Sequence, residues 1–535
     1  MLLLICINYN NPPSQTTQSQ HMQDKHEECD YDYDYDYDYI IVGGGPTGLA
    51  LAQVLSLSKR VLLVEKRDYL GGCHGVTRVH DGMMTEHGPR IYIDNFLMFT
   101  QLLNDMGVQF EDLFVKYNFS TATMMLEALR VLTLREIATL FWSFVTLNDS
   151  FKEITLMEYL SSHEFTNASI DILDRIGRLT DGGSADTYTL FSFLQILNQN
   201  FLYGIYQPRV PNDVGLFRIW EDALMKRGVG IMKNAAIDRF IVSDVSNADA
   251  NVKGIVLRDS RANESESSKS IVCGCKRIIL ACPPQEVQRI LTAHAELGAA
   301  FGPDFDRFQQ ETQYLPYISV IFHWISALRV PKIWGYPRTS WGVGNIVLSD
   351  YMDFNDPRSK TVISAVVTMP DRPSEHLALS ANEIGDKRGV MNEVFRQLRQ
   401  IYPDLPDPDY QFLTQSAYDA ASRRWVPFNH AFMTTTHGHV PNQSVLYANL
   451  YNCGVQNGNS SYSFTSMESS VANAVHLATE LQPELKDSTA TNANVNVAKV
   501  REAITVRSCV AVIAAAACIG VACMGFALHR RRHMK

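Results

Sequence analysis

The sequence predicts an α/β protein with a parallel sheet at its core and a second domain inserted into the first. Two observations carry this prediction. An apolar run, Tyr39 to Val42, leads into a glycine-rich turn, and a second apolar run, Val61 to Val64, follows a small-residue stretch of helical character. Strand-like runs return after positions 206 and 421, beyond segments with other patterns. At 535 residues the chain is long enough for two or three domains.

The turn, GGGPTG at positions 43–48, has the spacing of a dinucleotide-binding loop. Gly43 permits the tight turn, Gly45 lets the backbone approach a pyrophosphate, and Gly48 lets the helix pack closely on the strand. The amides of the helix N-terminus would then face the phosphates. Glu65, at the end of the second apolar run, can accept hydrogen bonds from both ribose hydroxyls. A glycine loop with only a structural role would leave Glu65 unexplained, so the pattern predicts a Rossmann-like dinucleotide site.

The segment Glu65 to Gly72, EKRDYLGG, narrows the choice of dinucleotide. It resembles the continuation found in FAD-binding flavoproteins of the flavin amine oxidase and glutathione reductase superfamily, in which a second glycine pair follows the acid. NAD-binding Rossmann domains usually lack that pair. The resemblance therefore implies FAD as the cofactor. Cys73 follows the pair, where relatives often have arginine.

Three later segments resemble the same superfamily in chain order. Gly88 to Tyr92 (GPRIY) resembles a glycine-led segment that passes close to the isoalloxazine ring, with Arg90 where UDP-galactopyranose mutase usually has histidine. The segment 230–240 resembles one whose backbone meets the adenine, and the matching residue is Ile237. Arg277 to Pro284 resembles the strand that leaves the FAD domain and must end at its proline pair.

The last FAD motif is expected near the C-terminal end of the body of the chain. We expect a strand at Ser444 to Ala448 and a small-residue helix at Thr465 to Ala478. The resemblance implies that this helix, which carries Met467 near its start, points its positive end at the flavin. Relatives usually have Gly-Asp or Gly-Glu after the strand, where we place Asn449 and Leu450.

Other elements follow from apolar spacing. The expected helices are Phe96 to Met106, Leu126 to Val145, Thr189 to Leu197, Leu216 to Arg227 and Glu383 to Ile401, and the expected strands are Val252 to Arg258, Ser270 to Val272, Tyr317 to Trp324 and Thr361 to Met369.

The predicted fold class is α/β: a discontinuous Rossmann-like FAD-binding domain with an inserted α+β substrate domain and a C-terminal transmembrane helix. The expected parts are a low-complexity N-terminus (1–37), an FAD-binding domain in three parts (38–95, 206–290 and 421–482), a substrate domain in two parts (96–205 and 291–420), a linker (483–507), a transmembrane helix (508–528) and a basic tail (529–535).

The membrane prediction rests on Ser508 to Leu528, 21 residues without a charge between Arg507 and the Arg530 to Arg532 cluster. About 20 helical residues span a bilayer core. With so few residues after it, the helix resembles a single-pass tail anchor. The apolar start, MLLLICI, has no basic residue before it, so we expect no cleaved signal and a catalytic domain that faces the cytosol. The positive-inside rule alone would instead place the basic tail, which follows the membrane helix, on the cytosolic side.

Charge and cysteine usage exclude other classes of function. A net charge of −10, without a basic patch in the body of the chain, argues against nucleic-acid binding. The ten cysteines are scattered, without a CxxC pair or zinc-ligand spacing, which argues against a structural metal.

The resemblance implies an oxidoreductase that moves a hydride from an organic small-molecule substrate, such as a lipophilic compound or an amine, to flavin. Amine-oxidising relatives place a lysine on a substrate-domain strand, where this chain has Ser319. Some monoamine oxidases attach flavin through a cysteine in a region that resembles 425–436, and this chain has none there, so FAD is expected to be noncovalent. Two alternatives stay open: a flavin-dependent isomerase like UDP-galactopyranose mutase, and a non-catalytic FAD-binding protein.

Two sets of residues are predicted for the site. The candidates near the reacting ring are Arg90, His323, Trp425 and Tyr462, although buried aromatic residues are also ordinary core residues. The residues expected to bind the cofactor are Gly43, Gly45, Pro46, Thr47, Gly48, Glu65, Lys66, Arg67, Gly71, Gly72, Gly88, Arg90, Ile91, Ile237 and Met467.

Overall fold

The computed structural model describes residues 36–488, together with positions 515 and 519. Gaps in that range lie at 80–81, 89, 118–126, 182, 203, 244–249, 262–270, 333–337, 414, 428–429, 431–432, 436–437, 464 and 487. The predicted N-terminal low-complexity segment lies almost wholly outside the described residues, as do most of the linker, the transmembrane run and the basic tail. Within the described part, no helix has both the length and the apolar character needed to cross a bilayer.

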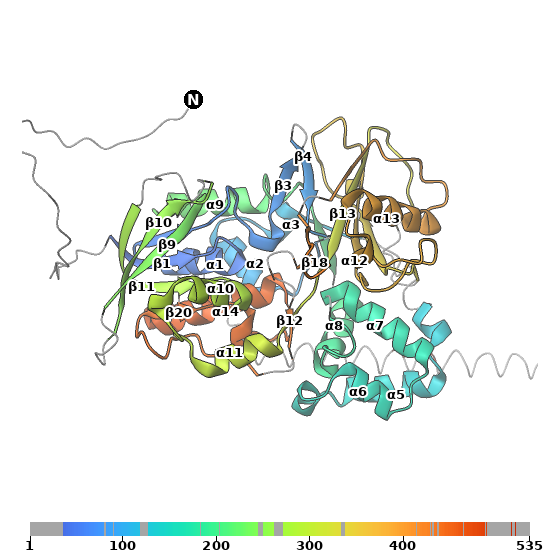
Figure 1. Ribbon diagram of the computed structural model, residues 1–535, viewed down its shortest axis with the longest axis horizontal. Helices are drawn as coiled ribbons and strands as arrows, with labels where there is room; N and C mark the ends of the chain where they lie inside the picture. The colour runs from blue at the N-terminus through green and yellow to red at the C-terminus, as the bar shows by residue number, and fades with distance from the viewer. Residues whose placement is uncertain are drawn as a thin grey trace, which may run out of the picture. The chain divides into compact units, whose positions relative to one another are not determined.

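A seven-stranded sheet is the largest sheet of the described residues, and Figure 1 shows it with helices packed against it. Its order is β8-β2-β1-β11-β10-β9, and β20 also pairs with β11. Strands β1, β2, β8, β11 and β20 run parallel, whereas β9, β10 and β11 pair antiparallel. The bounds are β1 Tyr37–Val42, β2 Val61–Val64, β8 Gly230–Met232, β9 Ala235–Val242, β10 Val252–Asp259, β11 Ile271–Leu280 and β20 Leu450–Asn452.

Both faces of β1 are buried, which explains its unbroken apolar run. Tyr39 and Ile41 pack with helices α1 (Pro46–Leu55), α2 (Leu97–Asp105), α9 (Leu216–Lys226) and α14 (Met467–Leu481). Ile40 and Val42 point to the opposite face and pack with α10 (Pro284–Ala293) and α11 (Gly302–Glu311). The sheet is therefore covered by helices on both sides, as in α/β folds of the Rossmann type.

A second, antiparallel sheet has the order β14-β15-β13-β16. Its strands are β13 Ile318–Trp324, β14 Val343–Val347, β15 Thr361–Val367 and β16 Tyr410–Phe412. One face packs on α12 (Ala381–Ile384) and α13 (Lys387–Ile401), where Val320, Phe322 and Ala365 meet Val394 and Leu398.

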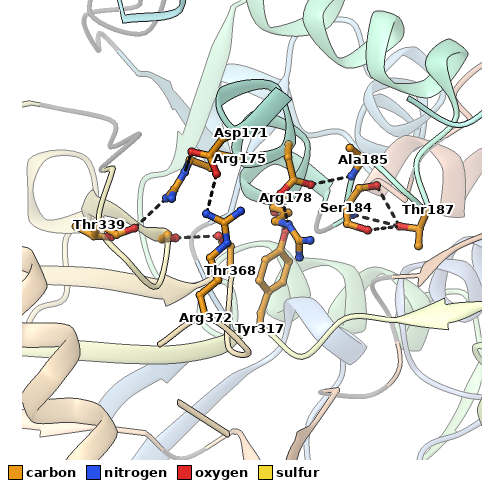
Figure 2. Close-up of polar contacts among 12 residues, drawn as sticks. Asp171, Arg175, Arg178, Ser184, Ala185, Thr187, Tyr317, Thr339, Thr368 and Arg372 are labelled. Carbon is orange, nitrogen blue, oxygen red and sulfur yellow. Dashed lines mark hydrogen bonds and ion pairs between the residues drawn. The ribbon is translucent and has the colours of Figure 1, made fainter. Parts of the chain in front are cut away.

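Four helices form a third group with its own apolar core. They are α5 Leu134–Val145, α6 Leu156–Ser162, α7 Asn167–Asp181 and α8 Leu190–Leu202. Polar contacts join α7 to the second-sheet region (Figure 2). Asp171 pairs with Arg372 at 2.7 Å, Arg175 donates to the Thr339 carbonyl at 2.8 Å, and the Tyr317 hydroxyl donates to the Arg178 carbonyl. These bonds fix α7 beside the start of β13.

The remaining elements are short. They are α3 Phe110–Leu113, the hairpin β3 Val76–Val79 with β4 Met83–Glu86, the small sheet of β5 Tyr92–Ile93, β6 Phe114–Lys116 and β7 Ile205–Pro208, and the pairs β12 Gln313–Tyr314 with β19 Met433–Thr434 and β17 Ala417–Asp419 with β18 Arg424–Val426.

The predicted α/β class with a parallel sheet is confirmed, but three predicted elements are wrong in detail. Ser270 to Val272 is not a separate strand, because β11 continues from Ile271 to Leu280. The helix predicted from Glu383 is broken by Gly385, which has a φ of +60°, and Asp386 caps the new helix. The long helix predicted at 126–145 is interrupted: residues 127–131 are helical, and α5 begins at Leu134, where Thr133 and Glu136 form a capping box.

The strand predicted at Ser444 to Ala448 is also wrong. The Ser444 hydroxyl accepts from the amides of Leu446 and Tyr447, which closes a turn, and the strand β20 begins at Leu450. Asn449 accepts from the Val252 amide and donates to the carbonyls of Val252 and Lys276, so its role is to fasten this turn to the sheet.

Candidate dinucleotide site

A cavity of about 840 Å³ lies at the carboxyl ends of the parallel strands. Val42 and Val64 end β1 and β2, while Ala281 and Cys453 directly follow β11 and β20, and all four line the cavity. Ligands of open α/β sheets bind at this edge. The far wall is formed by other elements, with Leu179 from α7, Ile196 from α8 and Val366 from β15.

The glycine turn borders this cavity and leaves space beside it. A Cβ on Gly48 would lie 1.9 Å from the Gly43 carbonyl oxygen, so only glycine lets α1 pack against the turn. A Cβ on Gly45 would meet nothing closer than the Gly72 Cα at 3.8 Å. Gly45 is the N-cap of α1 and supplies no side-chain cap, and Gly45, Pro46 and Thr47 line the cavity, so the positive end of α1 lies where an anion could bind.

Glu65 is held in place by two backbone amides. Its Oε2 accepts from the Gly44 amide at 2.8 Å and its Oε1 from the Arg67 amide at 2.9 Å. The side chain is buried and lines the cavity. A carboxylate has about four lone-pair sites, so two amides leave room for ligand hydroxyls. The arrangement fits a ribose at the tip of β2.

A second helix also begins at the cavity. Ser466 caps α14 through its hydroxyl, which accepts from the Ser469 amide at 3.0 Å, and Ser466, Met467 and Ser470 line the cavity. Glu468 accepts from the amides of Met98 and Phe99, which ties α14 to α2. The positive ends of α1 and α14 therefore both lie at the cavity.

Most of the residues predicted to bind the cofactor are brought together here. Of the set, all but Gly48 and Gly71 line the cavity, namely Gly43, Gly45, Pro46, Thr47, Glu65, Lys66, Arg67, Gly72, Gly88, Arg90, Ile91, Ile237 and Met467. Gly48 and Gly71 lie behind the wall and shape it. A Cβ on Gly71 would lie 2.4 Å from the Phe217 ring, and the φ of Gly71 is +107°.

The candidates predicted near the reacting ring are not brought together. Arg90 lines the cavity, but His323, Trp425 and Tyr462 are not among its lining residues. His323 is buried on β13 between the Ser359 hydroxyl and the Met84 carbonyl, and burial lowers its pKa to about 4. The Trp425 indole donates to the Ala381 carbonyl at 3.0 Å inside the second-sheet core.

Tyr462 lines a separate pocket of about 60 Å³. Its hydroxyl accepts from the Asn95 side chain at 3.1 Å and donates to the Asn95 carbonyl at 3.2 Å. Ser319, predicted at the position of the family lysine, is buried with its hydroxyl beside Gly88 and does not line the cavity.

Several lining residues were not predicted from the sequence. Cys73, His74, His87 and Tyr317 lie around Arg90 or across from it, and Cys453, Gly454 and Gln456 follow β20. For Cys453, Gly454 and Gln456, the sequence feature that could have predicted them is the glycine at position 454, shortly after the segment Leu450 to Asn452. This glycine was overlooked because the strand was predicted too early in the chain. The residues that follow the strand are 453–454, whereas the prediction placed Asn449 and Leu450 there.

The charges around Arg90 are unusual for a protein interior. Burial and the nearby guanidinium lower the pKa of both His74 and His87 well below the ordinary value, so both imidazoles are neutral. Burial raises the pKa of Glu86 to about 7. Arg90 itself is 3% exposed.

The fold and this cavity together define a protein of the Rossmann-like, dinucleotide-binding class. The sequence profile of the NAD(P)-binding Rossmann-like domain matches residues 41–105. Curated protein sequences include none that matches the chain.

Solved structures share the fold over most of the chain. Putrescine oxidase bound to putrescine is 15% identical, with a TM-score of 0.53, over 83% of this chain and 98% of that one. Cyclohexylamine oxidase from Brevibacterium oxydans IH-35A is 13% identical, with a TM-score of 0.55, over 84% and 100%. An oxidoreductase from Methanosarcina mazei is 12% identical, with a TM-score of 0.57, over 82% and 99%. The chain thus shares its fold with these oxidases.

Proposed function

We propose that the protein is an FAD-dependent oxidoreductase that takes a hydride from a small organic substrate, with amines as the first class to test. The observation that carries the proposal is one continuous cavity that joins the Glu65 dinucleotide site to a wall from the second sheet and the helical group. The fold shared with two amine oxidases supports the amine class. Bound FAD would supply the hydride acceptor.

The residues of this chain fit that cofactor. Glu65 would hold the ribose hydroxyls, the amides after Gly45 would hold the phosphates, and the α14 N-terminus would face the flavin. We propose noncovalent binding. Cys73, Cys282 and Cys453 line the cavity, but burial raises the pKa of each thiol, so these thiols stay protonated and weakly nucleophilic.

The wall opposite the dinucleotide site fits an apolar substrate with an uncharged nitrogen. Leu179, Ile196, Val366 and Met433 supply apolar surface, and His87 lies at the same cavity with a neutral imidazole. An amine must lose its proton before a hydride can leave the adjacent carbon, and a neutral imidazole can accept a hydrogen bond from the neutral amine.

Anaerobic titration of the FAD-loaded protein with a panel of amines tests this function. We expect one class, larger and more apolar than putrescine, to bleach the flavin absorbance. Bleaching by no amine, with FAD bound, would contradict the amine proposal. Bleaching by another oxidisable class would keep the oxidoreductase and change its substrate.

We further propose that residues 508–528 anchor the protein in a membrane, with the catalytic part facing the cytosol. The uncharged run between Arg507 and the arginines at 530–532 supports this. The full chain should stay with membranes after alkaline carbonate extraction, and a chain ending at residue 507 should not. Release of the full chain by carbonate would contradict the anchor.

A further inference from the structure

Arg90 is a buried cation without an ion pair among the described residues. Its side chain lines the cavity and is 3% exposed. No described carboxylate forms an ion pair with it. Its charge acts on the buried Glu86 carboxyl group, but burial raises the pKa of that group to about 7, and the Arg90 Nε has no hydrogen-bond partner. One terminal nitrogen donates to the Cys73 carbonyl. Burying an unpaired guanidinium is costly, so a bound anion is expected to complete the site.

The position of Arg90 shows where that anion would lie. The carbonyl that holds its guanidinium belongs to Cys73, which directly follows Gly72. Gly72 packs on the glycine turn, since a Cβ on it would lie 3.1 Å from the Gly45 Cα. Gly45 is the N-cap of α1. The guanidinium is therefore fastened to the loop that lies against the α1 N-terminus, and both groups attract negative charge.

Other basic side chains near the α1 N-terminus are not expected to bind this anion. The Arg67 guanidinium lies over the Tyr69 ring, 5.5 Å from its centroid. Lys66 pairs with Glu286 at 2.9 Å. His74 and His87 lie beside Arg90 and are neutral.

We propose that Arg90 binds a phosphate of the dinucleotide and supplies, from the segment after β4, the positive charge that faces the α1 N-terminus. This inference rests on the proposed function, because the anion is part of the cofactor. A guanidinium suits phosphate because its planar N–H groups can donate two parallel bonds. The Cys73 carbonyl oxygen positions the guanidinium by accepting a further hydrogen bond from it.

The test compares Arg90→Met with wild type by calorimetric titration of the cofactor-free full chain with FAD, ADP and adenosine. ADP carries the two phosphates, and adenosine carries none. We expect Arg90→Met to bind FAD and ADP about tenfold to a hundredfold more weakly, since bonds to charged groups contribute at that level, and to bind adenosine as wild type does. Arg90→Lys should lie between the two.

Two further variants keep the result interpretable. Arg78→Met removes a nearby arginine that is fully paired with Asp213 at 2.7 Å and lies outside the cavity, so it should leave ADP affinity unchanged. Cys73→Arg added to Arg90→Met returns a guanidinium to the same loop and should recover part of the ADP affinity. Recovery would exclude misfolding as the cause of the loss.

The outcomes separate this inference from the proposed function. Unchanged ADP affinity in Arg90→Met would overturn the inference alone, as would an equal loss for adenosine. Unchanged FAD and ADP affinity with weaker binding of a carboxylate such as benzoate would overturn it in favour of a substrate-binding role. Wild-type protein that binds ADP but not FAD would overturn the flavin proposal only, and binding of neither would overturn both.

Discussion

Two corners of the cavity differ in whether their buried charged groups are paired within the protein. At the Glu65 corner, comprising Glu65, Lys66 and Glu286, the charges meet partners from the protein: Glu65 accepts from two amides, and Glu286 pairs with Lys66 and Arg289. At the Arg90 corner, comprising His74, Glu86, His87 and Arg90, polar atoms without a hydrogen-bond partner in the described part include Arg90 Nε, His74 Nδ1 and Glu86 Oε1.

The difference indicates which corner is complete before a ligand arrives. At the Glu65 corner each charge has a partner within the protein, so the fold itself fixes the site. The Arg90 corner is assembled from two loops and leaves polar groups for a ligand to satisfy. Substitutions at the first corner should therefore alter contacts that exist before a ligand binds, whereas those at the second should alter ligand affinity and the pH dependence of stability.

The largest effect is expected from Gly48→Ala. The added Cβ would lie 1.9 Å from a backbone oxygen that cannot move without shifting β1 or α1. We expect a loss of about 3 kcal/mol or more in the free energy of unfolding, measured by urea denaturation. Gly45→Ala is the matched control, since its Cβ meets no atom within 3.8 Å. It should fold like wild type but bind FAD more weakly. Equal stability of Gly48→Ala and wild type would contradict the packing described here.

The Arg90 corner should give the cofactor-free protein an unusual pH dependence. Glu86 has a pKa of about 7 in the folded state and an ordinary value of 4.5 when unfolded. Between these values the unfolded chain loses a proton that the folded chain keeps, so stability falls as pH rises from 4.5 to 7, by about 3 kcal/mol at most. Below 4.5 this contribution is fully present.

The check is urea denaturation at pH 5 and pH 8 with Glu86→Gln as the comparison. Burial also raises the pKa of Glu468 to about 7, whereas the lowered pKa values of His74 and His87 make stability rise with pH below 6.5. The test is therefore the difference in slope: from pH 5 to pH 8, Glu86→Gln should lose less stability, or gain more, than wild type. An identical slope in Glu86→Gln would show that Glu86 does not titrate in this window.

Glu65→Gln tests the Glu65 corner without changing its shape. The amide side chain keeps one accepting oxygen and replaces the other with an NH2 group that only donates, so a ribose hydroxyl and one backbone amide lose a charged acceptor. We expect FAD affinity to fall by about tenfold or more, equivalent to about 1.5 kcal/mol, in a fluorescence titration. ADP affinity should fall in parallel. A loss confined to FAD would place Glu65 near the flavin instead of the ribose.

The smallest effect on the cofactor is expected from Trp425→Phe. The indole donates to Ala381 within the second-sheet core, away from the cavity. Losing that bond should reduce the free energy of unfolding by about 1 kcal/mol, with FAD affinity unchanged. If FAD binding fell without a change in stability, Trp425 would have a role at the flavin that its position does not explain.

The two corners also differ in how well the sequence predicts them. The strand, glycine turn, helix, strand and Glu65 are contiguous, so local spacing was enough to predict their structure. The Arg90 corner depends on contacts between distant segments, and Arg90 alone was predicted there from the resemblance. His323, Trp425 and Tyr462 were chosen by residue type, and the structure places them away from the cavity because buried aromatic residues usually serve the core.

The misplaced strand near position 446 shows the same limit. Val445 and Leu446 look like part of a strand, but both are exposed, and the Ser444 hydroxyl turns the chain. Strand β20 is set by pairing of Leu450 with Ile278, more than a hundred residues earlier, which no local pattern reveals.

The most direct test of the account is the absorption spectrum of the purified full chain before and after denaturation. We expect flavin bands with about one FAD per chain, as expected for a single dinucleotide site, and release of all the flavin into solution when the protein unfolds. A folded, colourless protein that takes up no FAD on titration would contradict the central claim, and flavin that stays attached to the unfolded chain would contradict noncovalent binding.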